Sequence, residues 1–556
     1  MTENKSNPII GITLEGFQVF DKPTYIPLKR LTLIFGPNSA GKSAVQDAID
    51  LYAALMSREA AGSYKQFYEA ETLLARHWRR TGFSDDSRVA NLSISVVHTT
   101  QADLNGIVEY ELNRKIWGDF LARNGHAFEL ESRWRFDRWE SPDGSFSFET
   151  CFEFYIESVL LVKHSPTELL VNLNHPLLSQ TELMVDFVML AKTYPDEVSL
   201  DDGQLTVRGR FSGFHPNGAA SEFQRDSWMG YYTDQGLAHP SNDKSTLFYA
   251  AIVELSLVLD CILSAANGNS RFRPLKVDAS RMVPTRQDLT FQIGNLDDAM
   301  HPMSFPDRRI YRTLAESLAS ELTNVQENFP DPDLLEKYPN LPSSANRRKY
   351  ADAVNHALAD HLFLEQGYRL DFDFRLLMSE ANSKAGLIEG MSLEPSEFGF
   401  LVELHLRDGK GRRHLFQDVG SGIGYLLPVL CAVYERSGGE STCLIQQPEL
   451  HIHPALQAAM GDVFIEGSEE DHQLLIETHS EHLLLRVLKR IRQTHLQAAI
   501  APELKISADD VCVLYFDPSP DGGTTVKRLR ITEDGEFMDR WPRGFFAERD
   551  QELLDE

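Results

Sequence analysis

A glycine-rich loop near the N-terminus constrains the fold of this chain more than any other feature. It matches the pattern G-x-x-x-x-G-K-[ST] and consists of Gly36, Pro37, Asn38, Ser39, Ala40, Gly41, Lys42 and Ser43. An apolar run at 31–35 precedes the loop and predicts a buried strand, and apolar residues at helical spacing follow it at 44–56. In such a strand–loop–helix unit, backbone N–H groups and Lys42 can hold phosphates, and the Ser43 hydroxyl can bind Mg²⁺. The loop therefore predicts an α/β fold with a nucleotide site.

Composition indicates a globular protein with several lobes. The 556 residues are 42% hydrophobic and 24% charged, and no apolar run is long enough to cross a membrane. The polar N-terminus lacks the apolar core of a signal peptide, so a cytoplasmic location without membrane contact is expected. Five scattered cysteines predict neither disulfides nor a cysteine zinc site. The net charge of −28 opposes nonspecific binding to nucleic acid, so any such contact must be local.

Four further signals follow one another from position 418 onwards. A glycine-rich turn at 418–424 leads into an apolar helix, and a short strand at 442–445 ends in Gln446 and Gln447. An amphipathic helix then leads to a strand at 473–476, which ends close to His479 and is followed by another helix. Alternating strands and helices predict a parallel sheet whose site lies at the carboxyl ends of the strands.

The order of these signals resembles the ABC-type ATPase heads of SMC, RecF-like and OLD-like proteins. The resemblance covers roughly residues 8–60 and 395–556, and it implies ATP and Mg²⁺ as ligands. It also implies that two heads close on two ATP molecules, with Gln446 and Gln447 in the place of the Walker B acidic residues and His479 as the switch histidine. The turn with Ser421, Gly422 and Gly424 corresponds to the signature loop, which contacts the γ-phosphate held by the second head.

Within that family the chain is most similar to the ATPase subunits of Septu-type antiphage defence, including the retron-associated version. The stretches 531–537 and 541–546 carry this part of the resemblance. It implies a homodimer or higher oligomer formed through the heads, and a separate nuclease subunit of the HNH type. A reverse transcriptase with retron nucleic acid is a further partner that the resemblance implies.

The two glutamines depart from the family pattern in a way that bears on mechanism. A carboxylate at the first position binds Mg²⁺, and one at the second accepts a proton from the attacking water. The amide of Gln447 has no basicity near neutral pH, whereas Gln446 could still offer its carbonyl oxygen to a metal held with Ser43. Losing a base costs about 10²–10⁴-fold in rate, so ATP is expected to bind and to turn over slowly or not at all. Glu449 could take over as base if a local bulge turned it inward.

The predicted fold class is α/β, an ABC/SMC-like P-loop ATPase head with an antiparallel β lobe and a helical insertion in place of a coiled coil. The expected domains are a split head at 1–60 and 395–556, a β lobe at 61–240 and a mainly helical insertion at 241–394. Alternating apolar residues at 89–97, 108–112, 128–136 and 145–162 support the β lobe, and helical spacing at 245–262, 310–325 and 350–364 supports the insertion. The stretch 277–286 resembles a recurring strand and turn of these ATPases, without a role for Arg281 or Arg286.

Three functions from different classes remain open at this point. The first is a regulatory ATP-binding subunit of a defence complex that holds or controls a nuclease. The second is a cycling ATPase of DNA repair or recombination in the manner of RecF and SMC proteins, which the glutamines and the acidic charge disfavour. The third is a nuclease of the OLD type, which would need a catalytic domain after the head. His451 and His453 lie too close in sequence, and without a third ligand nearby, to predict a zinc site.

Overall fold

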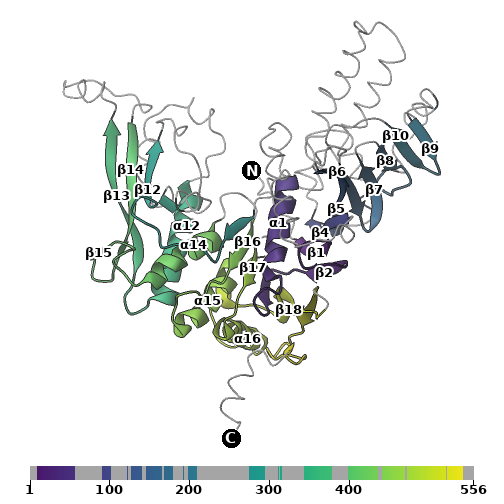
Figure 1. The fold of residues 1–556 in the computed structure, drawn as a ribbon. Helices are drawn as coiled ribbons and strands as arrows, with labels where there is room; N and C mark the ends of the chain where they lie inside the picture. Colours follow the sequence, from purple (N-terminus) through teal and green to yellow (C-terminus); the bar gives the residue numbers. More distant parts are fainter. Residues whose placement is uncertain are drawn as a thin grey trace. The chain divides into compact units, whose positions relative to one another are not determined.

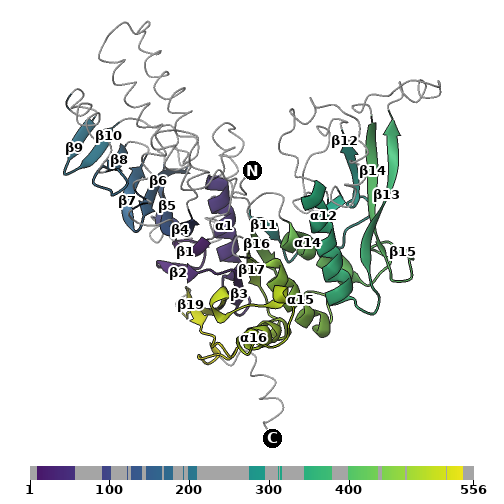
Figure 2. The same ribbon diagram turned by 180° about the vertical axis from the view of Figure 1, so that it is seen from behind.

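The chain forms two compact units, and each is described by itself. The computed structural model describes residues 9–56, 91–101, 127–140, 146–165, 168–178, 198–208, 274–294, 344–378, 398–435, 441–469, 472–520 and 523–542, with a few single positions between them. Figures 1 and 2 show these elements from opposite sides. The first unit comprises 1–30, 35–274 and 514–528, and the second comprises 31–34, 275–513 and 529–556.

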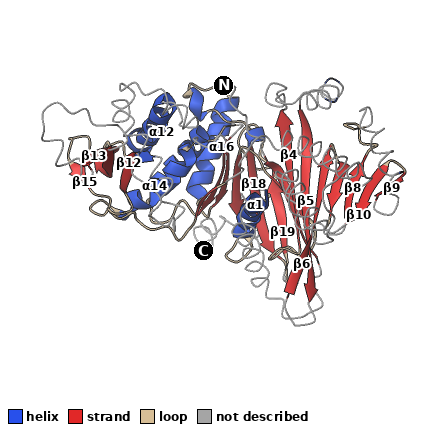
Figure 3. Ribbon diagram, turned by 90° about the horizontal axis from the view of Figure 1, so that it is seen from above, coloured by secondary structure: helices blue, strands red, loops and turns tan. Residues whose placement is uncertain are grey.

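A nine-stranded antiparallel sheet makes up much of the first unit. Its strand order is β2-β1-β4-β5-β6-β7-β8-β10-β9, and Figure 3 shows most of these strands in red as one series. The strands are β1 (Ile9–Glu15), β2 (Thr24–Pro27), β4 (Asn91–Gln101), β5 (Ala127–Glu140), β6 (Phe146–Ile156), β7 (Val159–His164), β8 (Glu168–Asn172), β9 (Val198–Asp201) and β10 (Gln204–Arg208). The antiparallel pairing of these strands confirms the predicted β lobe. Alternate side chains, such as Trp134, Phe136, Phe152 and Phe154, are buried, as the alternation of apolar residues predicts. The predicted strand at 108–112 lies outside the described residues.

A six-stranded sheet has the order β11-β16-β17-β3-β18-β19. Its strands are β3 (Leu31–Phe35), β11 (Leu275–Val277), β16 (Ser441–Gln446), β17 (His472–Glu477), β18 (Val511–Pro518) and β19 (Thr524–Leu529). The pairs β11–β16, β16–β17 and β17–β3 are parallel, and every residue of β3 and β17 is buried. Continuous apolar burial is expected for parallel strands covered on both faces. The border between the two units falls within β3, β18 and β19.

Three helices follow β3, β16 and β17 of this sheet, and a fourth precedes β16, as the sequence predicts. They are α1 (Lys42–Met56), α14 (Ser421–Tyr434), α15 (Pro454–Gly467) and α16 (Glu481–His495). Helix α16 illustrates how the sequence specifies a helix. The Ser480 side chain caps its start by accepting from Leu483 N, and Leu484, Val487, Leu488 and Ile491 lie on its buried face. Short 3₁₀ turns at Pro502–Leu504 and Ala508–Asp510 lead on to β18.

The stretch 241–394 contains strands as well as helix in its described part. Helix α12 (Ser344–His356) continues into a π-helical segment, η3 (Ala357–Leu362), which confirms the helical spacing seen at 350–364. Strand β11 belongs to the six-stranded sheet, and β12 (Thr290–Gly294) and β13 (Arg369–Met378) pair with β14 (Phe398–Arg407). A two-residue strand, β15 (Arg413–His414), also pairs with β14. The segment 245–262 lies outside the described residues, and the domain boundaries themselves remain predictions.

Within the described residues, no helix combines the length and the apolar character that a membrane crossing requires.

Candidate functional site

The phosphate loop, Gly36–Ser43, has the geometry that its sequence predicts. Strand β3 leads into it, and α1 begins at Lys42, so the loop lies at a helix N-terminus, where the helix dipole favours an anion. Three loop residues have positive φ angles, namely Gly36 at 146°, Ser39 at 64° and Gly41 at 84°. Asn38 and Ser39 are exposed, so the crest of the loop is open to solvent.

Glycine is required at two positions of this loop. A Cβ atom at Gly36 would lie 2.5 Å from the carbonyl oxygen of Phe516, and one at Gly41 would lie 2.1 Å from Cγ2 of Val19. Positive φ angles add strain for any other residue at both positions. The two glycines therefore allow the loop backbone to pack closely against Phe516 and Val19.

Lys42 is buried inside the curve of the loop. Its Nζ donates to the carbonyl oxygens of Gly36 and Pro37, both at 3.0 Å. The Thr524 hydroxyl holds the same loop by donating to the carbonyl oxygen of Ala40 at 2.9 Å. A positive charge at the loop fits a phosphate, because an anion binds an ammonium group more strongly than carbonyl oxygens do.

Gln446 and Gln447 lie at the carboxyl end of β16, in the second unit. The Gln446 Oε1 atom accepts from the backbone N of Ala279 at 3.2 Å. Gln447 has a positive φ of 45°, and its backbone N donates to the carbonyl oxygen of Glu477 at 2.7 Å. The chain therefore turns sharply at Gln447, and the turn is fixed to the end of the neighbouring strand β17.

Arg281 is the residue at this site whose role the sequence does not reveal. Its side chain is almost fully buried, and its guanidinium donates to Tyr425 O at 2.9 Å, Gln446 O at 2.9 Å, Gln447 O at 3.0 Å and Pro448 O at 3.2 Å. Five N–H donors in a planar fork suit such a set of converging carbonyl groups. Arg281 thus connects the end of β16 to the first turns of α14, and only the three-dimensional convergence of these carbonyl groups identifies it.

Glu449 faces the segment that carries His479. Its carboxylate accepts from Thr478 Oγ1 at 2.8 Å and from the backbone N of His479 at 2.6 Å, and Thr478 N donates to Ile34 O at 3.1 Å. Burial raises the pKa of Glu449 above its ordinary value, against the lowering effect of these donors. The structure thus brings a carboxylate two positions after Gln447 next to the predicted switch histidine.

The predicted signature turn forms the start of α14. Gly420 is the N-cap residue, and no side chain caps the helix there. A Cβ atom at Gly424 would lie 2.4 Å from Cγ1 of Val283, and one at Gly422 would lie 3.3 Å from the carbonyl oxygen of His451. These glycines therefore serve close packing within the chain, while Ser421 stands at the first position of the helix.

His451 and His453 have structural contacts. The His451 ring lies 4.5 Å from the Tyr425 ring, measured between centroids, and Nδ1 of His453 accepts from Ala455 N at the start of α15. That these histidines do not form a metal site stays a prediction.

The donors present fit ATP and Mg²⁺ at two separate places in the chain. The phosphate loop offers Lys42, the Ser43 hydroxyl and backbone N–H groups, and the end of β16 offers the Gln446 carbonyl oxygen. Bound Mg²⁺ would neutralise phosphate oxygens. Gln446 can contribute one neutral oxygen, because an amide carbonyl with one hydrogen bond keeps a second lone pair. The roles of Gln446, Gln447 and His479 in catalysis remain predictions.

Comparisons with known proteins agree with a P-loop ATPase. Residues 263–486 match the family described as "AAA domain, putative AbiEii toxin, Type IV TA system". Solved structures with a similar fold include an SMC head bound to the C-winged helix domain of ScpA (TM-score 0.39, 11% identity, 94% of this chain and 98% of that one). Another is the SMC head domain from Thermotoga maritima (TM-score 0.33, 9% identity, 94% of this chain and 99% of that one). These scores are low, so no role of those proteins is transferred.

No curated protein matches the chain significantly. The matched family segment contains β16, β17 and the signature turn, and the phosphate loop lies before it in the sequence. Together with the phosphate loop, the parallel strands and their helices form an α/β P-loop fold.

Proposed function

We propose that this chain is a slowly hydrolysing ATP-binding subunit, in which bound ATP sets the state of an assembly. The observation that carries this proposal is the replacement of both Walker B carboxylates by Gln446 and Gln447, at a strand end that is otherwise firmly built. Arg281 and the Gln447–Glu477 hydrogen bond hold that strand end in place. The phosphate loop keeps every residue that its binding pattern requires.

Slow hydrolysis follows from the chemistry of the two amides. Gln446 and Gln447 can orient a ligand or a water molecule, but neither can accept a proton near neutral pH. A water molecule attacking the γ-phosphate would therefore have to lose its proton to a weaker acceptor. We expect ATP to stay bound for many times longer than in an ATPase with both carboxylates.

The proposed assembly is a dimer of heads with ATP between them, joined to a separate nuclease that the ATP-bound state holds or controls. Its proposed setting is bacterial antiphage defence of the Septu or retron-associated type. The C-terminal segment supports this setting by its sequence resemblance, and part of it forms a small turn in which Ile531 pairs with Phe537 and Phe537 packs against Trp541. The retron nucleic acid and the reverse transcriptase belong to the same proposal.

The test is to purify the full chain together with the products of its neighbouring genes and to measure three quantities. Native mass gives the stoichiometry, extraction gives the nucleotide carried, and a single-turnover assay gives the rate of phosphate release. We expect ATP to be retained in a complex of several chains, with release slower than about one per minute. Release at the ordinary rate of about 1–10 s⁻¹ would contradict the proposal.

A cycling ATPase is the second candidate, and the position of Glu449 favours it. A half-buried carboxylate with a raised pKa, placed beside His479, is a suitable proton acceptor if its present donors release it. In that case Glu449→Gln would abolish phosphate release that the wild type shows, and DNA would stimulate the wild-type rate. If ATP is retained equally by both proteins, the first candidate stands.

A further inference from the structure

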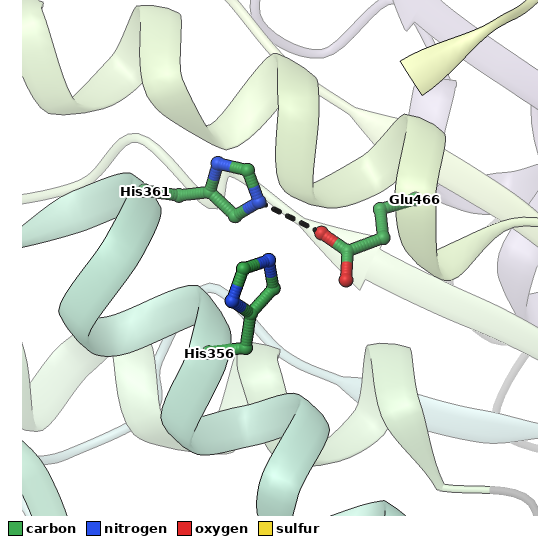
Figure 4. Close-up of side chains that lie close together, drawn as sticks. All are labelled: His356, His361 and Glu466. Carbon is green, nitrogen blue, oxygen red and sulfur yellow. Dashed lines mark hydrogen bonds and ion pairs between the residues drawn. The ribbon is translucent and has the colours of Figure 1, made fainter. Parts of the chain in front are cut away.

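Two histidines and a glutamate from separate elements converge in the second unit. His356 ends α12, His361 lies in η3, and Glu466 lies near the end of α15, as Figure 4 shows. One ligand atom from each residue lies within 4.8 Å of the other two. His361 Nε2 is 2.8 Å from Glu466 Oε2, and the two imidazole centroids are 4.9 Å apart.

The π-helical segment explains why the two histidines meet. Residues five apart point about 140° away from each other in an α-helix, which has 3.6 residues per turn. In a π-helix the turn is wider and the hydrogen bond spans five residues, so positions i and i+5 come onto one face. The bond from Phe363 N to Leu358 O, at 2.8 Å, has this spacing. Wide turns of this kind are frequent at functional sites.

A carboxylate outside the cluster orients His356. Asp360 Oδ2 lies 2.8 Å from His356 Nδ1, so the other ring nitrogen, Nε2, faces His361 and Glu466 (Figure 4). A histidine that binds a metal commonly makes such a bond through its second nitrogen, which fixes the ring and raises its basicity. Glu466 and His361 are each 15% exposed in their side chains, whereas His356 is 43% exposed and leaves a path for an ion from solvent.

We propose that His356, His361 and Glu466 bind a divalent transition-metal ion, and that Zn²⁺ suits this donor set best. Two imidazole nitrogens and one carboxylate are preferred zinc ligands, and three protein ligands leave a fourth position for water. Tetrahedral coordination at about 2.0–2.2 Å requires the ligand atoms to lie about 3.3–3.5 Å apart. The 2.8 Å between His361 Nε2 and Glu466 Oε2 and the 4.8 Å limit on the three separations lie on either side of this spacing. Mg²⁺ prefers oxygen ligands and is a poor fit.

A bound ion would join two parts of the second unit. Segment α12–η3 supplies both histidines, and α15, the helix that follows Gln446 and Gln447, supplies the glutamate. The existing His361–Glu466 hydrogen bond already links them, and a metal would replace it with stronger, directional bonds. The site would therefore raise the thermal stability of the full chain on metal binding, since an ion that binds only the folded state stabilises it.

The test uses the full chain without nucleotide, titrated with Zn²⁺ by calorimetry and with Co²⁺ by visible absorption. We expect the wild type to bind one ion more than His361→Asn or Glu466→Gln, with a tetrahedral Co²⁺ spectrum that both variants lose. Asp360→Asn should weaken binding by about 10–100-fold, as expected for a residue that positions a ligand. Mg²⁺ should not compete with Zn²⁺ at this site.

His495→Asn is the matched control, because His495 also lies near two carboxylates, Glu533 at 3.3 Å and Asp534 at 3.7 Å. It should bind Zn²⁺ as the wild type does. Equal binding by wild type, His361→Asn and Glu466→Gln would overturn the proposal, and so would an equal loss in His495→Asn. Should His361→Asn fail to fold, the more exposed His356→Asn gives the same comparison, with thermal unfolding as the check on folding.

Discussion

The phosphate loop and the end of β16 differ in how well they match the pattern that the sequence resembles. The loop keeps each expected residue, with a lysine that donates to its carbonyl oxygens and glycines that are closely packed. The end of β16 has two glutamines where that pattern has carboxylates, and the buried Arg281 holds it in place. Binding and hydrolysis depend on different residues, so one can be kept while the other is reduced. This comparison underlies the proposal that the chain binds ATP and turns it over slowly.

The largest expected effect comes from restoring the carboxylates. Gln446→Asp/Gln447→Glu should raise the rate of phosphate release by about 10²–10⁴-fold, because a base becomes available to the attacking water. The measurement is single-turnover hydrolysis of radiolabelled ATP, with Gln457→Glu as a control change of the same type outside the strand end. An unchanged rate in the double variant would mean that the loss of carboxylates is not what limits hydrolysis.

Removing the buried arginine tests whether the end of β16 is rigid. Arg281→Ala should lower the free energy of unfolding by about 3–5 kcal/mol, because several buried carbonyl groups lose a charged donor. Thermal unfolding measures this loss. Arg286→Ala is the control: Arg286 pairs with Glu403 at 2.6 Å but is 56% exposed, so about 1 kcal/mol or less is expected. Similar losses of unfolding free energy in both variants would show that Arg281 contributes no more to stability than an exposed arginine does.

Replacing Lys42 tests whether the phosphate loop binds ATP. Lys42→Ala should weaken ATP binding by about 10–100-fold, since a charge-assisted hydrogen bond contributes about 1.5–3 kcal/mol. Isothermal titration with a non-hydrolysable ATP analogue measures the affinity, and Lys505→Ala, an exposed lysine outside the loop, should leave it unchanged. If Lys42→Ala bound the analogue as the wild type does, the loop would not be the phosphate site.

Local sequence patterns predicted most of the sheet and the loop, whereas they could not predict the contacts of the site. Strand β3, strand β17 and helix α16 follow from apolar runs and helical spacing, which are short-range signals. Arg281 meets the carbonyl groups of Gln446 and Gln447 from about 165 positions away, and no spacing rule connects them. The pairing of His361 with Glu466 likewise depends on a π-helical turn, a backbone irregularity that helical spacing does not reveal.

The smallest expected effect depends on pH and concerns the ion pairs between helices α15 and α16. Asp462 in α15 is paired with Arg490 at 2.7 Å and with Arg486 of α16. Burial alone would raise the pKa of Asp462, but hydrogen bonds and charge from the two arginines hold it below its ordinary value of 3.8. A lowered folded-state pKa means that the ion pair stabilises the protein above about pH 4, and that this stability is lost as the pH falls through the folded-state value.

Asp462→Asn should therefore cost about 1–2 kcal/mol of unfolding free energy at pH 7, and the difference from wild type should shrink below pH 4. Denaturant unfolding of both proteins at a series of pH values measures this. Asp539→Asn serves as the exposed control, because Asp539 pairs with Arg530 at the surface and should matter less. If the difference in unfolding free energy between wild type and Asp462→Asn stayed constant from pH 7 to pH 3, Asp462 would act through packing. In that case the strand ends would not depend on charge pairing between α15 and α16.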